Sequence, residues 1–208
     1  MSRIKQIHCG DVNCHLIQGE QGAILVDTGR AGYGEKLLPL CRQWDVRLIV
    51  LTHGHVDHVQ NAAFLSQQLE VPIAMHRADL DLLTDNDSQP MQAHRRFGRL
   101  LRSLSRRGFH DTLLPPFQPE LFLEDGDDLS HFGVAARIIA LPGHTAGSIG
   151  LQTEDGALLV GDAMFHLISV SPALLYADRR QMEDSVAKIW ALHPTALYFG
   201  HGRPAQGL

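Results

Sequence analysis

The chain has 208 residues, of which 44% are hydrophobic and 20% are charged, and these values are ordinary for a globular protein. The formal net charge of −5 argues against a general affinity for nucleic acid, and no apolar run approaches the length of a membrane-spanning helix. Three cysteines without disulfide-scaffold spacing, and an amino terminus without an apolar signal segment, favour a reduced, cytoplasmic protein. We therefore expect one domain over residues 1–208 that has no membrane partner.

The amino-terminal part of the chain predicts three antiparallel strands that end at an acidic residue. Strand-like runs at 4–9, 13–18 and 22–27 are separated by Gly-Asp and Gly-Glu-Gln sequences that are typical of turns. Asp27 stands at the end of the third strand. It has two interpretations, either a turn residue that caps the following helix or a carboxylate that orients a metal-binding loop.

Residues 53–58, His-Gly-His-Val-Asp-His, concentrate three imidazoles and one carboxylate in a single loop. The apolar run at 46–51 predicts a buried strand before this loop, and the apolar spacing over 57–69 predicts a helix after it. Imidazole nitrogen and carboxylate oxygen are ligands that zinc prefers, and packing them together has no structural benefit without a cation. The sequence therefore predicts a metal site at His53, His55, Asp57 and His58.

A basic segment interrupts the middle of the chain. A helix over 37–44, a strand over 72–76 and a short helix over 77–83 precede a polar loop at 84–89. Residues 91–109 then predict an amphipathic helix, with four arginines on one stripe: Arg95, Arg99, Arg102 and Arg106. Either this stripe is a solvated face on a helical insertion at about 85–119, or Arg99 and Arg102 contact an anionic part of the substrate. The leucine face would pack on the body or on a second subunit, which leaves a homodimer open.

Three strands of the second half lead to residues that can bind a metal. Strands are predicted at 121–124, 134–141, 148–153, 157–161 and 196–199, and a helix at 182–192. The strand at 134–141 leads to His144, the strand at 157–161 to Asp162, and the strand at 196–199 to His201. Each residue alone would be a weak signal, but their joint occurrence at strand ends, as for His53, is strong.

Together these motifs resemble the metallo-β-lactamase-fold hydrolases, in particular their small, glyoxalase II-like members. The family signature H-x-H-x-D-H stands here at residues 53–58, and the later His, Asp and His of the family match residues 144, 162 and 201. The resemblance implies an α/β fold, a four-layer αβ/βα sandwich of two mixed sheets flanked by helices. It also implies two metals bridged by Asp162, with Asp27 as the early acid. The implied ligands are His53, His55 and His144 for one metal and Asp57, His58 and His201 for the other.

The implied chemistry is hydrolysis by a hydroxide that bridges two divalent metals, zinc in the first place, with iron and manganese as alternatives. A divalent ion lowers the pKa of bound water to about 7, so that hydroxide can attack an ester, thioester or lactone carbonyl at neutral pH. Asp57 is expected to accept a proton. Related lactonases carry a tyrosine three residues after the bridging aspartate, where this chain has Phe165, and the neighbouring His166 is a candidate substitute. We expect Phe165 and His166 to contact the substrate.

Two other functions remain open on the same residues. An iron-dependent oxidoreductase, similar to the persulfide dioxygenases or oxygen reductases of this fold, fits because histidine and carboxylate ligands suit iron as well as zinc. A phosphodiester or nucleic-acid hydrolase would use the arginine stripe, although that stripe is too short to replace the RNA-binding arm of the related nucleases. Antibiotic hydrolysis is disfavoured because the secreted β-lactamases have a cysteine where Asp162 stands.

Overall fold

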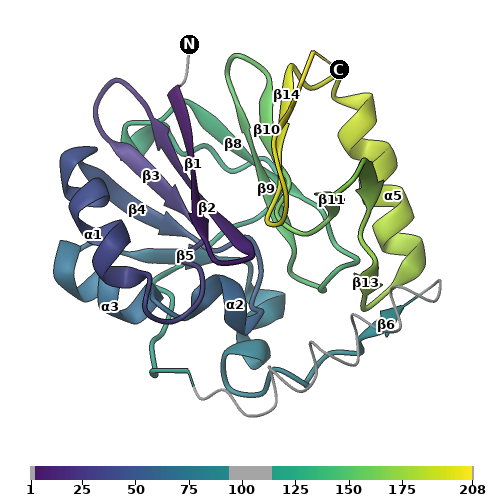
Figure 1. Ribbon diagram of the computed structural model, residues 1–208, viewed down its shortest axis with the longest axis horizontal. Helices are drawn as coiled ribbons and strands as arrows, with labels where there is room; N and C mark the ends of the chain where they lie inside the picture. Colours follow the sequence, from purple (N-terminus) through teal and green to yellow (C-terminus); the bar gives the residue numbers. More distant parts are fainter. Residues whose placement is uncertain (1–2, 94–113, 208) are drawn as a thin grey trace.

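The computed structural model describes residues 3–93 and 114–207, and two facing β-sheets form its centre (Figure 1). The first sheet has the strand order β1-β2-β3-β4-β5-β7. Strands β1 to β3 are antiparallel neighbours, whereas β3, β4, β5 and β7 run parallel. The strands are Arg3–Cys9 (β1), Val12–Gln18 (β2), Ala23–Val26 (β3), Val46–Val50 (β4), Ile73–Met75 (β5) and Leu121–Phe122 (β7).

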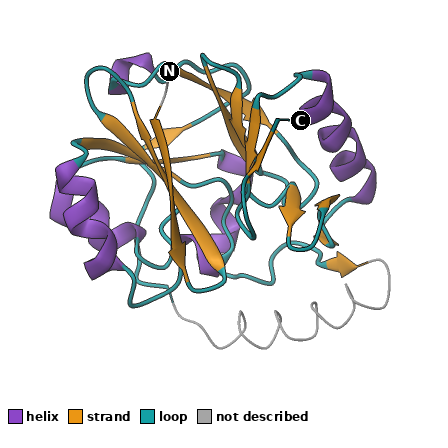
Figure 2. Ribbon diagram, turned by 45° about the horizontal axis from the view of Figure 1, so that its top comes forward, coloured by secondary structure: helices purple, strands orange, loops and turns teal. Residues whose placement is uncertain are grey.

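The second sheet has the order β15-β14-β10-β9-β8, and two short strand pairs lie beside it (Figure 2). Only the β10–β14 pair of this sheet is parallel. Its strands are Ala136–Ala140 (β8), Ile149–Thr153 (β9), Ala157–Leu159 (β10), Ala196–Tyr198 (β14) and Ala205–Gln206 (β15). The short pairs join Met164–His166 (β11) to Val170–Pro172 (β12) and Leu175–Tyr176 (β13) to Gln92–Ala93 (β6).

Helices cover the outer face of each sheet, which gives the predicted four-layer αβ/βα sandwich. In Figure 1, α1 and α3 lie outside the first sheet and α5 lies outside the second. The helices are Gly34–Gln43 (α1), Val56–Val59 (α2), Ala62–Leu69 (α3) and Arg179–Ala191 (α5), with 3₁₀ turns at Arg77–Leu83 (η1) and Ser130–Phe132 (η2). None of the helices in the described ranges has the length and apolar character of a membrane span.

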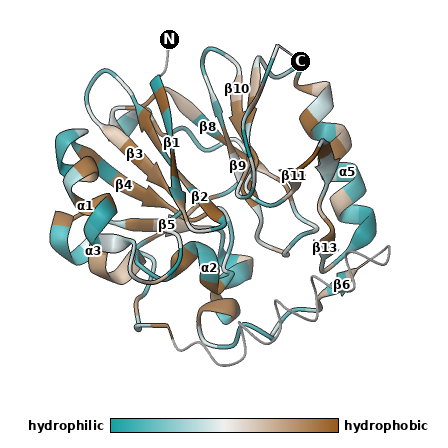
Figure 3. Ribbon diagram, in the orientation of Figure 1, coloured by the Kyte–Doolittle hydropathy of each residue, from teal (hydrophilic) through white to brown (hydrophobic). Residues whose placement is uncertain are grey.

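Apolar side chains pack between these layers, and the central strands are coloured mostly as hydrophobic in Figure 3. Successive side chains of a strand point to opposite faces of its sheet, so a strand between two layers must be apolar throughout. In β3, Leu25 packs toward α1 and α3, while Ile24 and Val26 pack toward the second sheet. On the far side, Ile189 of α5 packs with Leu158 of β10. The strands that precede the candidate ligands are therefore fixed by burial on both faces.

The helix predicted over 57–69 is interrupted. Helix α2 ends at Val59 and α3 begins at Ala62. Between them, the side-chain amide of Asn61 donates to three successive carbonyls of the loop after β3, those of Thr28 at 2.7 Å, Gly29 at 3.1 Å and Arg30 at 2.7 Å. Asn61 therefore ties the break to this loop, a tertiary interaction that the apolar periodicity does not reveal.

The amphipathic helix predicted from residue 91 is wrong at its start. Gln92 and Ala93 form strand β6, which pairs with β13, because a partner strand far along the chain supplies the backbone hydrogen bonds. The remainder of the predicted helix, with Arg95, Arg99, Arg102 and Arg106, lies within 94–113, outside the described residues.

Candidate metal centre

A first triad of buried histidines, His53, His55 and His144, joins the loop after β4 to the loop after β8. One ligand atom from each residue lies within 4.8 Å of the others. The ring of His144 lies 4.8 Å from that of His53 and 4.7 Å from that of His55. The two sheets thus bring residues 89 positions apart into one site, with His144 Nε2 at 2.9 Å from His55 Nδ1.

A second triad, Asp57, His58 and His201, lies beside the first. Its ligand atoms also lie within 4.8 Å of one another. Asp162 lies between the triads. Its Oδ1 lies 3.6 Å from His58 Nε2, and its Oδ2 lies 3.3 Å from His201 Nε2 and 3.6 Å from His144 Nε2. One carboxylate therefore faces members of both triads.

Buried polar atoms in this cluster lack the hydrogen-bond partners that burial normally requires. Within the described residues, six buried side-chain nitrogen or oxygen atoms have no such partner. Four of the six belong to the cluster: His53 Nε2, Asp57 Oδ1, His58 Nε2 and Asp162 Oδ1. These are nitrogen and carboxylate oxygen atoms, the donor set that zinc or iron accepts. The residues present therefore fit metal ions at this position.

Hydrogen bonds behind the cluster fix the orientation of three imidazoles. His144 Nδ1 donates to the Leu175 carbonyl at 2.8 Å, and His201 Nδ1 donates to the Asp11 carbonyl at 2.7 Å. Because a carbonyl only accepts, the proton lies on Nδ1 and Nε2 is directed toward the cluster in both rings. His58 Nδ1 lies 2.9 Å from a carboxylate oxygen of Asp27, which has the same effect.

The backbone conformation of Asp27 suits its role in orienting the ring of His58. Its φ of 59° lies in the left-handed region, which aspartate tolerates better than most residues, at the end of β3. The Thr52 amide donates to Asp27 Oδ1 at 2.8 Å, and the Thr52 hydroxyl also donates to the carboxylate. The carboxylate therefore holds both the start of the metal-site loop and the ring of His58, rather than capping α1.

The two triads differ in charge. Burial, and then the charge of His58, lowers the pKa of His53 well below 6.5, and burial does the same for His55. Burial is also the largest single influence on His58 and His201, but the carboxylates that face them, Asp162 foremost, together outweigh it. The pKa of His58 is raised to about 9 and that of His201 to about 10. Conversely, burial raises the pKa of Asp162, but the charges of His201 and His58 hold it well below 3.8.

The cluster opens into a cavity of about 270 Å³ with one apolar wall. Met91, Phe165, Leu167 and Leu175 form this wall beside the metal-site residues. The ring of Phe165 lies 5.5 Å from that of His201 and 6.5 Å from that of His144. By the alternation of side chains along β11, the neighbouring His166 turns away. Its ring packs against Phe199 and its Nδ1 bonds the Arg203 carbonyl, and it does not line this cavity.

Two residues that the sequence did not single out lie at the rim of the cavity. Arg30 Nη2 lies 3.7 Å from Asp57 Oδ2 and donates to Asp11 at 2.9 Å. The backbone carbonyl of Asp11 also holds His201, so this ion pair connects two members of the second triad. Asp11 lies in the turn between β1 and β2, and Arg30 lies in the loop between β3 and α1. The sequence around these two residues does not predict a functional role, since charged residues in loops are common on protein surfaces.

The comparisons with known proteins agree with this geometry. The model of the metallo-beta-lactamase superfamily matches residues 8–201. The probable metallo-hydrolase YflN of Bacillus subtilis is 26% identical over 203 residues, covering 90% of this chain and 74% of YflN. The hydroxyacylglutathione hydrolase GloC of Haemophilus influenzae is 35% identical over 158 residues, covering 74% of this chain and 66% of GloC.

Solved structures share the fold. The protein TTHA1623, crystallised in a di-iron-bound form, is 26% identical with a TM-score of 0.74, and the match covers 97% of this chain and 94% of TTHA1623. The BLEG-1 B3 metallo-beta-lactamase has a TM-score of 0.76 at 21% identity, covering 98% of this chain and 93% of BLEG-1. The second of these likenesses concerns the fold alone.

Proposed function

The chain belongs to the metallo-beta-lactamase superfamily, and on that premise we propose that it is a binuclear metal-dependent hydrolase of a small ester, thioester or lactone. The observation that carries this proposal is the set of four buried nitrogen and carboxylate oxygen atoms without hydrogen-bond partners in the described residues. Two of these atoms, on Asp57 and Asp162, belong to residues that line a cavity with an apolar wall. Such atoms are costly to bury unless a cation pairs with them.

Each residue of the cluster has a role in this proposal. The first triad would hold one metal and the second triad the other, with Asp162 shared. Divalent ions so placed lower the pKa of bound water to about 7 and polarise a carbonyl oxygen. Asp57 would also accept a proton, since its buried carboxylate lies at the cavity beside His201. Asp27 would keep His58 in its ligating tautomer.

The cavity supports a small acyl substrate. Its volume of about 270 Å³ is below the range of about 300–1,000 Å³ typical of drug-sized ligands, and its apolar wall suits a short carbon chain. Phe165 brings no hydroxyl to this wall, which weighs against the lactonase interpretation and favours an ester or thioester. The names of YflN, a probable metallo-hydrolase, and of GloC, a hydroxyacylglutathione hydrolase, point in the same direction.

Metal analysis followed by a substrate panel tests the proposal. Freshly purified protein should contain zinc, and it should hydrolyse thioester or ester substrates faster than lactones or phosphodiesters. Chelation should abolish this turnover and added zinc should restore it, because the proposed mechanism needs a bound divalent ion to lower the pKa of water. Hydrolysis that survives complete metal removal, or metal-loaded protein that turns over phosphodiesters alone, would contradict the proposal.

A second candidate rests on one observation, the di-iron-bound form of TTHA1623. Histidine and carboxylate ligands hold iron as well as zinc. In that case the protein would be an iron-dependent oxidoreductase. Purified protein would then contain iron, and its absorption spectrum would change on exposure of the reduced form to oxygen, whereas the zinc protein would show neither.

A further inference from the structure

Asp79 of η1 is a fully buried carboxylate that accepts four hydrogen bonds. Its Oδ2 accepts from the Gly54 amide at 3.0 Å and from the Thr145 hydroxyl at 2.6 Å. Its Oδ1 accepts from the Gly147 amide at 2.7 Å and from the side-chain amide of Gln89 at 2.9 Å. Three of these donors belong to the loops after β4 and after β8, so one side chain bonds both loops.

The bonded positions are adjacent to every member of the first triad. Gly54 stands between His53 and His55, and Thr145 follows His144. A shift of either loop relative to η1 would therefore move ligand atoms directly. Because buried hydrogen bonds are costly to leave unmade, the four bonds resist such a shift.

Close packing against η1 independently indicates the same constraint. A Cβ atom added at Gly54 would lie 2.7 Å from Leu82 Cβ and 2.8 Å from the Asp79 carbonyl oxygen. A Cβ atom added at Gly147 would lie 2.7 Å from Asp79 Cγ. Real Cβ atoms do not approach other atoms so closely. Both loops thus lie against η1 with no room for a side chain at the two positions that donate to Asp79.

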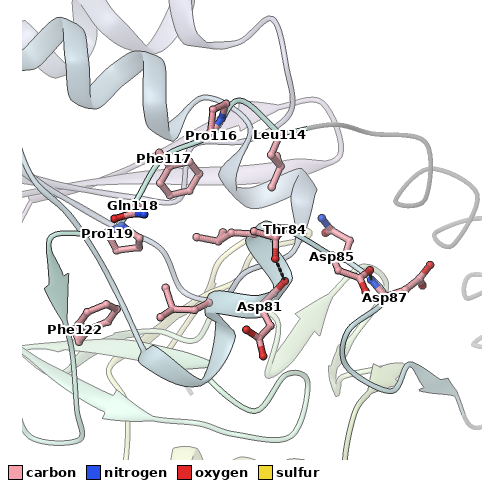
Figure 4. Close-up of a pocket in the computed structure, with 13 residues that line it drawn as sticks. Asp81, Thr84, Asp85, Asp87, Leu114, Pro116, Phe117, Gln118, Pro119 and Phe122 are labelled. Atoms are coloured by element: carbon pink, nitrogen blue, oxygen red, sulfur yellow. Dashed lines mark hydrogen bonds between the residues drawn. The ribbon is translucent and has the colours of Figure 1, made fainter.

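The residues after η1 extend this contact. Asn86 Oδ1 accepts from the Val56 amide at 2.9 Å, and Gln89 Oε1 accepts from the Ala146 amide at 2.8 Å. The other side of η1 faces a separate hollow of about 960 Å³ (Figure 4), where Asp81 is exposed. Asp79 and Asp81 are therefore two carboxylates of one turn, one bonded to the metal-site loops and the other outside them.

We propose that Asp79 is the positioning residue that holds the first triad in its metal-binding arrangement, an inference that rests on the proposed function. The second triad has other anchors. The His58 carbonyl accepts from the Thr28 amide at 2.7 Å and from the Thr28 hydroxyl at 2.9 Å, and the His58 ring bonds Asp27. Loss of Asp79 should therefore weaken the first metal site selectively.

Asp79→Asn is the sharpest variant because it keeps the shape and removes one acceptor. Each oxygen of Asp79 faces two donors, Gly54 and Thr145 on one side and Gly147 and Gln89 on the other. The amide nitrogen of asparagine does not accept, so either orientation loses two hydrogen bonds. Asp81→Asn is the matched control, with the same chemical change on the outer face of the same turn.

The two sites can be measured separately in single-site backgrounds. His201→Ala leaves only the first triad intact, and His144→Ala leaves only the second. In the His201→Ala background, Asp79→Asn should weaken zinc binding by about 10–100-fold, the range typical for residues behind a metal ligand. In the His144→Ala background it should leave zinc binding unchanged, and Asp81→Asn should change neither. Chelator competition gives these affinities without an activity assay.

Other outcomes separate this inference from the proposed function. Wild-type zinc affinity of Asp79→Asn in the His201→Ala background, or equal weakening in both backgrounds, would overturn the role of Asp79 and leave the proposed function intact. A wild-type protein that binds no metal would overturn the proposed function itself. If Asp79→Asn does not fold, Thr145→Val removes a single donor to Asp79 and should weaken the first site alone, by less than Asp79→Asn. An unchanged first site in Thr145→Val would overturn the inference.

Discussion

The two triads of the metal centre are built by different means. The first, His53, His55 and His144, consists of imidazoles alone, and burial lowers the pKa of His53 and of His55. The second contains a carboxylate, and its two histidines have raised pKa values because Asp162 and other carboxylates face them. The first triad is held by η1 and the second by the loops after β1 and β3.

This difference teaches that two neighbouring candidate metal sites can rest on largely different supports. Asp79 bonds the loops of the first triad, whereas Asp27 and the Asp11 carbonyl bond rings of the second. The carboxylate of Asp162 faces histidines of both triads directly. A variant at Asp79 should therefore act on the first triad, a variant at Asp27 should act mainly on the second, and a variant at Asp162 should affect both.

Asp162→Ala should have the largest effect, because it removes the one carboxylate that both triads share. We expect zinc affinity to fall at both sites and turnover to fall by more than the roughly 10²–10⁴-fold typical of a lost general acid or base. Metal content after dialysis and the rate of ester hydrolysis measure the two effects. Two tightly bound zinc ions in Asp162→Ala would contradict the shared role.

Asp57→Asn should affect turnover more than metal content. The amide keeps one oxygen to face the cluster but does not accept a proton at neutral pH, so kcat should fall by about 10²–10⁴-fold. Steady-state kinetics on protein with its zinc content measured alongside checks this expectation. Wild-type kcat in fully loaded Asp57→Asn would show that another group accepts the proton.

Asp27→Asn should act on the second triad through the tautomer of His58. Asparagine tolerates the positive φ of this position, so the backbone should persist. The Thr52 amide donates to Oδ1, so the oxygen of asparagine should take that position and its amide nitrogen should face His58 Nδ1. Nδ1 must then accept, the proton moves to Nε2, and this atom no longer binds a metal.

We expect zinc affinity to fall about 10–100-fold at the second site. The loss at the first site should be smaller, because Asp27 reaches it only through Thr52, whose hydroxyl lies 3.0 Å from His53 Nδ1. Measurement in the His144→Ala and His201→Ala backgrounds separates the two sites. A loss confined to the first site would reverse the assignment of Asp27.

Arg30→Ala should have the smallest effect. The pair with Asp11 leaves 40% of the Arg30 side chain and 62% of the Asp11 side chain exposed, and exposed ion pairs contribute about 0–1 kcal/mol. Thermal denaturation should therefore show a free energy of unfolding within about 1 kcal/mol of wild type. A larger loss would mean that the contact with Asp57 stabilises the second triad more than its 3.7 Å separation indicates.

The sequence predicts ligands better than it predicts their supports. His53, His144, Asp162 and His201 follow apolar strands, and parallel or neighbouring strands bring such ends together, so their convergence follows from local pattern. The role of Asp79 does not, because it lies in a 3₁₀ turn and its partners are about 25 and 66–68 positions away along the chain.

Short elements were missed for a related reason. Strands β11, β12 and β13 have two or three residues each, too few for an alternating pattern to be recognised. They nevertheless carry Phe165 and Leu175 into the cavity wall. The contact of Arg99 and Arg102 with an anionic substrate stays a prediction, since both lie outside the described residues.

The zinc content of three proteins tests the central claim most directly. Wild type, His144→Ala and His201→Ala should be loaded with excess zinc, freed of unbound metal and analysed for zinc per chain. Two separately supported triads predict two ions in wild type and one in each variant. One ion in wild type, or loss of all zinc from either variant, would contradict two sites that share only Asp162.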